Sequence, residues 1–343
     1  KLLEKQVKRF SPKYIAVNED GFKYFKKQGS IAQKNILNVF QDLEHLVALK
    51  EADIVVIAMR GSAALMPFLS AVTSGKTVAT ANKEALVIAG NIILKEAKKF
   101  NARVIPVDSE QSAIFQCLEG RTNNHVNKIH LTASGGTLLR VSKSRFDQIT
   151  VKEILNHPRW KMGQKITVDS ATLMNKGFEI IEAIKLFDLS VDQIHVVIHP
   201  EAIIHSMVEF DDGSVIAQLG VTDMRLPIQY ALTYPQRMDT GCAPLKFAQL
   251  KKLTFEEPDF KKFPALSLSI HVAKEDGTLP SVLNAADEVA VDAYLNQEIA
   301  LTQIYKITEK VVLKHKNKKN PDLNAILAAD AWAREEVRKE IYN

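Results

Sequence analysis

Two acidic residues follow an apolar run at a point where a ligand site can form. The run RVIPV, residues 103–107, is typical of a buried strand, and it leads directly into Asp108, Ser109 and Glu110. In extended backbone the side chains of Asp108 and Glu110 point the same way, and two such charges repel unless a cation lies between them. Two interpretations remain open: a divalent-metal site, or a helix start in which Asp108 is the N-cap and Glu110 enriches the first turn.

A second set of polar groups lies in VDSATLMNKGFEIIEA, residues 168–183. Wound as a helix from about Ser170, this stretch has an apolar stripe on one side and Asn175, Lys176 and Glu179 on the other. The ordinary explanation is a solvated face with a surface pair between Lys176 and Glu179. The alternative is that Glu179 joins the acidic pair after the strand, because ligands that are all oxygen atoms would select Mg²⁺ or Mn²⁺.

Two more polar groups follow predicted strands. TANKEALV places Asn82, Lys83 and Glu84 at a strand end, and an N-cap role explains Asn82 but not a lysine at a position where parallel sheets bind ligands. LTASGG places Ser134 beside two glycines, whose backbone can approach an anion closely. A tight turn is the competing explanation for that glycine pair.

The segment HPRWKMG combines His157, Trp160 and Met162 in a short loop between a proline and a glycine. Anchoring of the tryptophan in the core is the usual explanation for such a residue. A loop with several large side chains and a glycine hinge also fits a lid that closes over a site. Both interpretations remain open from the residues alone.

Side chains that often bind zinc are present but poorly placed for it. His195, His199 and His205 lie in apolar, strand-like surroundings without a cysteine nearby, so we expect ordinary hydrogen-bonded histidines. Cys117 and Cys242 cannot form a disulfide framework and do not form a Cys-x-x-Cys pair. A reducing compartment is the simplest interpretation.

The elements that must position these residues begin with four β-branched runs at residues 14–17, 53–59, 77–81 and 103–107. Segments with helical apolar spacing separate the later runs, and this alternation predicts a parallel sheet with helices on both faces. The predicted fold class is therefore α/β, with a doubly wound, Rossmann-like first domain over residues 1–107. Ligands in such sheets lie beyond the carboxyl ends of the strands.

The pattern changes further along the chain. Residues 108–240 read as an α+β domain that contains most of the candidate site residues, with a candidate mobile loop at 156–164 and an antiparallel hairpin that turns at Asp212 and Gly213. Residues 241–264 resemble a linker. Residues 265–343 show only helical patterns and predict an all-helical C-terminal domain.

Composition excludes several classes of protein. The chain has 343 residues, of which 25% are charged and 46% hydrophobic, and no apolar run is long enough to span a bilayer. The net charge of +5 is spread thinly, and its densest cluster, at residues 313–321, has no interleaved aromatic residues. We therefore expect a globular protein with neither a nucleic-acid nor a membrane partner.

Taken together and in order, six segments closely resemble the 1-deoxy-D-xylulose-5-phosphate reductoisomerase family. They are ANKEALV, VDSEQSAIF, TASGG, NHPRWKMGQKITVDSATLMNKGFE, HPEAIIHSM and DMRLPI. The block from Asn156 to Glu179 is long and distinctive, whereas TASGG alone would be weak. The resemblance extends over nearly the whole chain.

The resemblance implies a role for each matching residue. The metal carboxylates would be Asp108, Glu110 and Glu179. The catalytic residues would be Lys83, Glu110 and His205. The substrate-binding residues would be Lys83, Ser109, Glu110, Ser134, His157, Trp160, Met162, Ser170, Asn175, Lys176 and Glu179, with the phosphate held by Ser134, Ser170, Asn175 and Lys176. The cofactor-binding residues would be Ala58, Met59, Asn82, Glu84, Gly163 and Met224.

The resemblance also implies a reaction. The family uses NADPH and Mg²⁺ or Mn²⁺ to rearrange and reduce 1-deoxy-D-xylulose 5-phosphate to 2-C-methyl-D-erythritol 4-phosphate, a step on the route to isoprenoids. Its members are homodimers, so a homodimer is expected here. A bacterial cytoplasmic location is expected, with a plastid-type location as the alternative.

This chain departs from the family pattern in a few places. The family opens with a strand and a glycine-rich turn, roughly G-x-T-G-S-I-G, and the chain starts instead with KLLEKQVKRFSPKYIAV, so we expect it to be part of a longer protein. Asp287 stands where the NAANE motif has asparagine, and Arg60 stands in the turn beside the cofactor. The competing interpretation is a truncated or non-catalytic homologue that binds metal and sugar phosphate without turnover.

Overall fold

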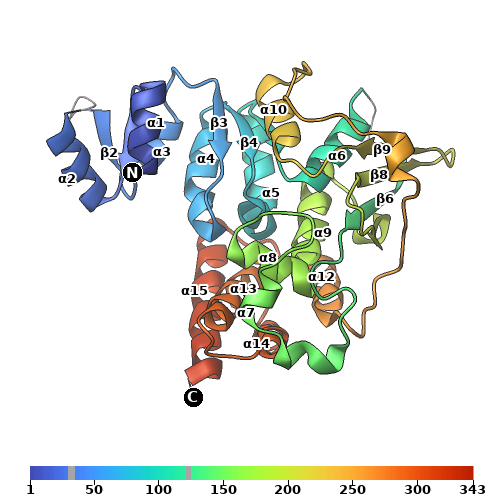
Figure 1. Cartoon of the computed structure of the whole chain (residues 1–343). Coiled ribbons are helices and arrows are strands. Elements are labelled where there is room, and N and C mark those ends of the chain that lie inside the picture. Colours follow the sequence, from blue (N-terminus) through green and yellow to red (C-terminus); the bar gives the residue numbers. More distant parts are fainter. Residues whose placement is uncertain (30–34, 121–124, 343) are drawn as a thin grey trace.

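The computed structural model describes residues 1–29, 35–120 and 125–342 of the chain. It has three regions in sequence order (Figure 1): parallel strands with helices, then a mixed sheet with helices, then a group of helices. The largest apolar cluster runs through all three regions, from β3 through α9 to α15, whereas a small separate cluster surrounds Val7 and Phe25 near the N-terminus. Among the described residues, no helix combines the length and the apolar character that a membrane span requires.

The first region alternates strands and helices, as the sequence predicts. Its elements are α1 (Leu2–Phe10), β1 (Ile15–Val17), α2 (Glu19–Gln28), β2 (Ile36–Asn38), α3 (Leu43–Val47), β3 (Ile54–Ile57), a 3₁₀ turn (Gly61–Ala64), α4 (Leu65–Thr73), β4 (Thr77–Thr80), α5 (Lys83–Lys99) and β5 (Arg103–Pro106). All strand pairs in this region are parallel. The α/β prediction is thus confirmed.

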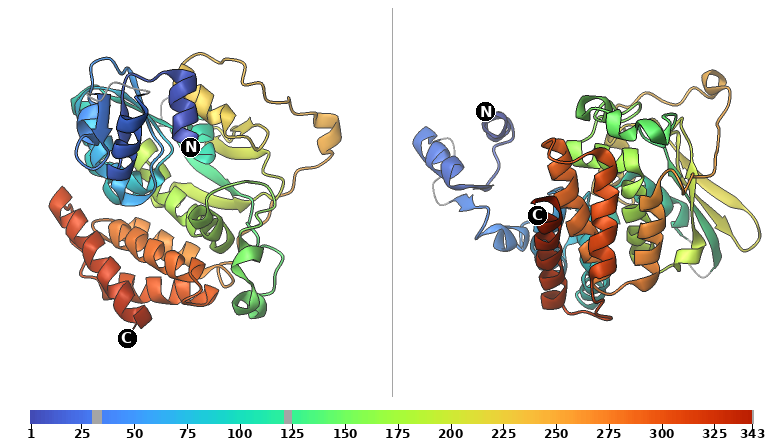
Figure 2. Two further views of the ribbon diagram at one scale, coloured as in Figure 1. Left: turned by 60° about the vertical axis from the view of Figure 1, so that its left-hand side comes forward. Right: turned by 90° about the horizontal axis from the view of Figure 1, so that it is seen from below.

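The arrangement of these strands differs from the single sheet that the sequence predicts. β1 pairs with β2, a three-residue strand that the sequence analysis missed, while β3, β4 and β5 form a separate sheet within the described residues. The reason is that the hydrophobic pattern shows where strands occur but not which strands pair. The right-hand view of Figure 2 shows β1 and β2, together with α1 and α2, at one side of the other elements.

The second region is α+β, as predicted. Its elements are α6 (Ser109–Leu118), β6 (Val126–Ala133), a 3₁₀ turn (Lys143–Gln148), α7 (Val151–Ile154), α8 (Gln164–Thr172), α9 (Met174–Phe187), a 3₁₀ turn (Val191–Gln193), β7 (Ile194–Ile198), β8 (Ile204–Phe210), β9 (Val215–Leu219), α10 (Arg225–Thr233) and α11 (Phe247–Leu250). The sheet has the order β7-β6-β8-β9, in which β6 and β7 are parallel and the other pairs antiparallel. β8 and β9 form the predicted hairpin, and Gly213 takes a positive φ of 80° in its turn.

The helix predicted from about Ser170 is in fact two helices. Leu173 takes a left-handed conformation with φ of 61°, which ends α8 and starts α9. A non-glycine residue in this conformation costs about 1–2 kcal/mol, and here it is fully packed in the core. The break changes the chain direction, so that Ser170 near the end of α8 and Asn175 at the start of α9 both reach one cavity.

The third region contains α12 (Pro264–Glu275), α13 (Leu279–Leu295), α14 (Leu301–Lys314) and α15 (Leu323–Tyr342). The predicted linker at 241–264 crosses from the mixed sheet to these helices (Figure 1), and within it Glu256 pairs with Ile198 in an antiparallel bridge at the edge of β7. Both α12 of the third region and α5 of the first region pack against α9. Because α9 also packs against α8 of its own region, it contacts elements of all three regions.

Candidate active site

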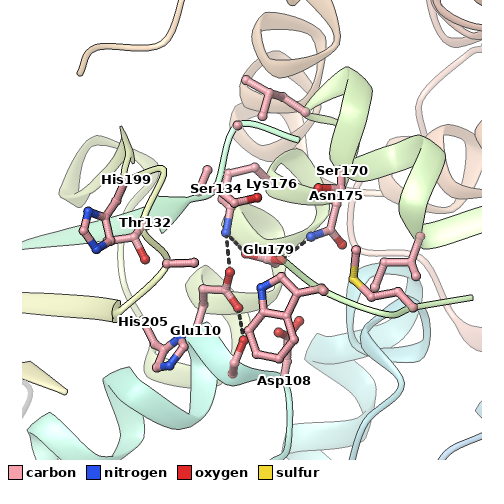
Figure 3. Close-up of a pocket in the computed structure, with 18 of the residues that line it drawn as sticks. Asp108, Glu110, Thr132, Ser134, Ser170, Asn175, Lys176, Glu179, His199 and His205 are labelled. Atoms are coloured by element: carbon pink, nitrogen blue, oxygen red, sulfur yellow. Dashed lines mark hydrogen bonds and ion pairs between the residues drawn. The ribbon is translucent and has the colours of Figure 1, made fainter. Parts of the chain in front are cut away.

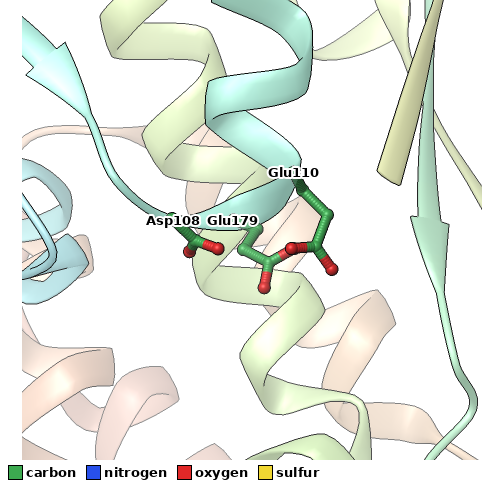
Figure 4. A group of neighbouring side chains, drawn as sticks. All are labelled: Asp108, Glu110 and Glu179. Atoms are coloured by element: carbon green, nitrogen blue, oxygen red, sulfur yellow. The ribbon is translucent and has the colours of Figure 1, made fainter. Parts of the chain in front are cut away.

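Three carboxylates meet between β5, α6 and α9. Asp108 lies two residues after the end of β5, Glu110 lies in the first turn of α6 and Glu179 lies on α9 (Figure 4). Ligand oxygens of the three residues lie within 4.8 Å of one another. The expected extended backbone at Glu110 is wrong, because α6 begins at Ser109. The helix start nevertheless keeps Glu110 beside Asp108. The predicted helix start is present, with Asp108 at the N-cap position and Glu110 in the first turn, but the Asp108 side chain makes no capping hydrogen bond to the described residues.

Two buried lysines lie among these carboxylates. Lys83, in the first turn of α5, forms ion pairs with Asp108 and with Glu179, the latter at 3.0 Å between Nζ and Oε1. Lys176 pairs with Glu110 at 2.9 Å and with Glu179. The pair between Lys176 and Glu179 exists, but the solvated-face interpretation is wrong, because the two residues are only 3% and 1% exposed.

Burial and neighbouring charges give two of the carboxylates opposite acidities. Burial raises the pKa of Asp108 to about 7, and the nearby Glu179 and Glu110 act in the same direction against the attraction of Lys83. Burial alone would also raise the pKa of Glu110, but Lys176 and Lys83 outweigh it and hold that pKa at about 2. Glu110 is therefore an anion throughout the neutral range, whereas Asp108 can release or take up a proton near neutral pH.

The donor set fits a hard divalent cation. All three groups offer oxygen ligands, which suit Mg²⁺ and Mn²⁺ better than zinc. Oδ2 of Asp108 is buried and contacts Lys83 as an ion pair without a well-oriented hydrogen bond, so this oxygen has coordinating capacity left. Asp108, Glu110 and Glu179 are the described residues that could hold such a cation.

A group of polar side chains lies beside the carboxylates, around His157. Nε2 of His157 is 3.2 Å from the hydroxyl oxygens of both Ser134 and Ser170. Its Nδ1 accepts hydrogen bonds from the backbone N–H groups of Arg159 and Trp160, so Nε2 carries the proton of the neutral ring. Burial lowers the pKa of His157, which favours this neutral form.

The glycine turn after β6 brings Ser134 close to α8. Gly135 and Gly136 have positive φ values of 82° and 62°, and a Cβ on Gly136 would lie 2.5 Å from the backbone oxygen of Ser170. Only glycine permits both the backbone conformation and this close approach. The turn therefore sets the spacing between Ser134 and Ser170, which Figure 3 shows facing the same cavity as Asn175 and Lys176.

The cavity between the carboxylates and the loop at 156–163 has a volume of about 260 Å³. The predicted residues that line it are Lys83, Asp108, Ser109, Glu110, Ser134, Trp160, Met162, Ser170, Asn175, Lys176, Glu179, His205 and Met224. The Trp160 ring lies 6.0 Å from the ring of His205, and burial lowers the pKa of His205. His157 does not line the cavity but contacts two serines that do.

A second cavity, of about 280 Å³, shares Lys83 and Asn175 with the first. Four of the residues predicted to bind the cofactor line it, namely Ala58, Met59, Glu84 and Gly163. Asn82 lies beneath it: its side chain caps α5 through the backbone N–H of Ala85 at 2.8 Å and donates to the Met59 carbonyl oxygen at 2.8 Å. Met224 lines the first cavity and is absent from the lining of the second.

Sequence reasoning missed two buried polar residues near these cavities. Glu182 follows Glu179 by one helical turn, and its pKa is raised by burial and by the charge of Asp108. Its three-residue spacing from Glu179 was the available signal. Asn284 of α13 lines the second cavity, and both of its side-chain polar atoms are buried without a hydrogen-bond partner among the described residues. The available signal was its place in the segment that matches the NAANE motif.

His199 is a satisfied core histidine, as expected. It is fully buried, Nδ1 is 2.9 Å from the Thr254 carbonyl oxygen, and Nε2 accepts from the backbone N–H groups of Ile203 and Ile204. These contacts hold the β7–β8 connection at the cavity edge. The remaining histidine of that group, His195, lies exposed on β7.

Three family models match successive parts of the chain. Residues 1–90 match "1-deoxy-D-xylulose 5-phosphate reductoisomerase", residues 104–187 match the C-terminal domain of that name, and residues 219–336 match "DXP reductoisomerase C-terminal domain". Among curated proteins, the enzyme of this name from Thermoanaerobacter pseudethanolicus is 48% identical over 340 residues, which are 99% of this chain and 89% of that protein. The one from Endomicrobium trichonymphae is 45% identical over 344 residues, with the same two shares.

Solved structures show the same likeness. A DOX-P reductoisomerase in complex with NADPH, fosmidomycin and magnesium superposes with a TM-score of 0.93 at 39% identity, covering 99% of this chain and 88% of that one. A reductoisomerase from Zymomonas mobilis in complex with NADPH has a TM-score of 0.91 at 36% identity, covering 100% and 89%.

Proposed function

The chain belongs to the 1-deoxy-D-xylulose 5-phosphate reductoisomerase family, and we propose that it carries out the family reaction at the two adjoining cavities. In that reaction NADPH and a divalent cation serve the conversion of 1-deoxy-D-xylulose 5-phosphate to 2-C-methyl-D-erythritol 4-phosphate. One observation carries the proposal: Lys83 borders both cavities and also pairs with the carboxylate cluster. A reductant in one cavity and a cation-bound substrate in the other would thus meet beside Lys83.

Asp108, Glu110 and Glu179 would hold the cation. When bound, Mg²⁺ or Mn²⁺ polarises a carbonyl group and lowers the pKa of a neighbouring hydroxyl group. Lys83 would donate hydrogen bonds to the substrate oxygens, because its carboxylate neighbours raise its pKa well above the ordinary value despite burial. Glu110, with a pKa of about 2, would remain an acceptor for the substrate hydroxyl groups, whereas His205 would act as a neutral ring.

The polar group around His157 would bind the phosphate. Ser134 and Ser170 offer hydroxyl groups, Asn175 an amide and Lys176 a positive charge along one side of the first cavity. Ser134 and Ser170 lie beside His157, whereas Asn175 and Lys176 also contact Glu179, so a phosphate bound at the serines would orient the remainder of the substrate toward the carboxylates. Trp160 and Met162 of the loop at 156–163 would then cover the substrate and exclude water.

The second cavity would take the nicotinamide end of NADPH. Its lining offers the apolar surfaces of Ala58 and Met59 beside Glu84 and Gly163, with Asn82 supporting the turn from below. The unpartnered Asn284 amide fits a ligand that itself carries a carboxamide, because two amides can exchange two hydrogen bonds. Met224 would face the reacting carbon from the first cavity.

The assembly and the location are also proposals. A homodimer is supported by the family resemblance and by β9, an outer strand of the mixed sheet whose residue Val215 is half exposed. A bacterial cytoplasmic location is supported by the bacterial origin of the relatives.

The test is to follow NADPH absorbance with the purified chain, 1-deoxy-D-xylulose 5-phosphate and Mn²⁺, with and without EDTA. Oxidation that EDTA abolishes is the expected result. A protein that binds Mn²⁺ and the sugar phosphate but oxidises no NADPH would be the non-catalytic homologue instead. Lys185→Met, which removes an ion pair outside both cavities, provides a control that should keep the parent rate.

A further inference from the structure

A buried charge cluster lies directly behind the loop at 156–163. Lys165, in the first turn of α8, pairs with Asp169 one helical turn later at 2.6 Å and with Asp287 of α13 at 2.7 Å. Both aspartates are buried, Asp169 at 2% exposure and Asp287 at 0%. This cluster therefore joins the helix that follows the loop to the C-terminal helices.

Lys165 is the member that binds the cluster together. Its ammonium group also lies 4.6 Å from the ring centre of Phe178 on α9, so it contacts three helices. Burial would lower the pKa of Lys165, but Asp169 and Asp287 raise it above the ordinary value, and the group stays charged. Neither carboxylate oxygen of Asp287 has a hydrogen-bond partner among the described residues, so the attachment of Lys165 to α13 is an ion pair, made by Oδ2, rather than a hydrogen-bond network.

The two ends of the loop are held by different parts of the molecule. At the first end, His157 contacts Ser134 and Ser170, and Arg159 donates to the Pro200 carbonyl oxygen at 2.9 Å. At the second end, α8 begins after Gly163, and the ion pair from Lys165 to Asp287 follows within two residues. Asp287 itself does not line either cavity, whereas Lys165 and Asp169 line the second one.

We propose that Asp287 is a positioning residue for the substrate loop. Acting through Lys165, it fixes the second end of the loop to the C-terminal helices, so that Trp160 and Met162 stay over the first cavity. The effect on substrate affinity rests on the proposed function, whereas the effect on the loop does not. A helix of the third region thereby contributes to a site that it does not touch.

The decisive variant is Asp287→Leu, which removes the acceptor but keeps a side chain of similar size. Removing one partner of a buried ion pair is costly when it leaves the other charge without a partner, but Lys165 keeps its ion pair with Asp169 in this variant. We expect an unchanged or higher thermal midpoint together with faster tryptic cleavage after Arg159 and Lys161, both exposed in the loop. Loss of an anchor of this kind raises local opening by about 5- to 30-fold.

Matched variants separate the anchor from general packing. Lys165→Met should also release the loop, but it leaves Asp169 and Asp287 buried without their cation and should therefore lower the thermal midpoint as well. Lys185→Met should not release the loop, although Lys185 also pairs with a C-terminal aspartate, Asp276, at the same 2.7 Å. Cleavage after Lys251, which is exposed in the segment at 241–264 outside the loop, provides an internal reference. Asp287→Asn, which retains an acceptor, should stay near the parent rate of loop cleavage.

In the turnover assay, Asp287→Leu should raise the KM for the sugar phosphate several-fold with a smaller change in kcat. Parent rates of loop cleavage in Asp287→Leu would overturn the proposal, as would equal acceleration of cleavage after Lys251. If Asp287→Leu does not fold, the comparison of Lys165→Met with Lys185→Met decides by the same cleavage criterion. Proteolysis gives this answer even if no variant oxidises NADPH, so failure of the proposed function would be seen separately.

Discussion

A methyl group added at Gly177 should disturb both packing and metal binding. Gly177 lies on α9 between Lys176 and Glu179, and its bare Cα faces Ser269 on α12. A Cβ at this position would lie 2.0 Å from the hydroxyl oxygen and 2.4 Å from the Cβ of Ser269. Since carbon atoms pack at about 3.5 Å, the two helices would have to separate by about 1 Å in Gly177→Ala.

The size of the effect follows from two opposed contributions. Overpacking of a filled core costs about 1–3 kcal/mol, and contacts this short belong at the upper end. Alanine has a higher helix propensity than glycine, which stabilises the folded variant by about 1 kcal/mol. We therefore expect a net loss of about 1–2 kcal/mol in the free energy of unfolding. A displacement of about 1 Å at Glu179 should also weaken function by about 100-fold.

A double-mutant cycle with Ser269→Gly measures this contact. Ser269→Gly removes the obstructing side chain together with its hydrogen bond to the Ala265 carbonyl oxygen, at 2.9 Å, and should cost about 1 kcal/mol by itself. The double variant should recover stability in urea unfolding and recover Mn²⁺ affinity by calorimetric titration, because the new methyl group fills the vacated space. The reasoning is refuted if Gly177→Ala matches the parent in both measurements, or if the second change rescues neither.

Three further predictions concern the same site. Glu179→Gln should reduce Mn²⁺ affinity by at least about 100-fold while the urea midpoint changes far less; near-parent affinity would remove Glu179 from the metal set. Because burial lowers the pKa of His157 below its ordinary 6.5, the unfolded chain takes up that proton first, and stability should fall as the pH drops through 6.5. His157→Gln should show a smaller acid loss of thermal midpoint, and an identical loss would contradict this assignment. Gly136→Ala should raise the KM for the sugar phosphate, since its Cβ would meet the Ser170 backbone oxygen at 2.5 Å; unchanged KM and midpoint would argue against this close approach.

Much of the fold could be predicted because its signals are local. The runs that form β3, β4 and β5, the hairpin at Gly213 and the long C-terminal helices each show their own periodicity. β2 (Ile36–Asn38) was missed because a run of three residues is too short to show a period. The left-handed Leu173 was missed because its conformation is fixed by burial rather than by its residue type.

The candidate site also contains some contacts that the sequence could predict and others that it could not. Lys83 and Asp108 could be brought together in advance, because both follow parallel strands and such strand ends share one edge of a sheet. The meeting of α9 with that edge came from the family resemblance and not from any pattern in the residues. No pattern in the sequence predicts the contact of Lys165 with Asp287, because this contact depends on how α13 packs against α8.

The lysines among the carboxylates have a consequence for the order in which ligands associate. With every group ionised, three carboxylates and two ammonium groups leave one net negative charge, which repels an anionic sugar phosphate. A divalent cation reverses that sign to one net positive charge. By thermodynamic reciprocity, if the bound cation raises the affinity for the substrate by some factor, the bound substrate raises the affinity for the cation by the same factor. The cluster thus makes the two ligands mutually dependent, and at low cation concentration the sugar phosphate itself becomes the agent that recruits the metal.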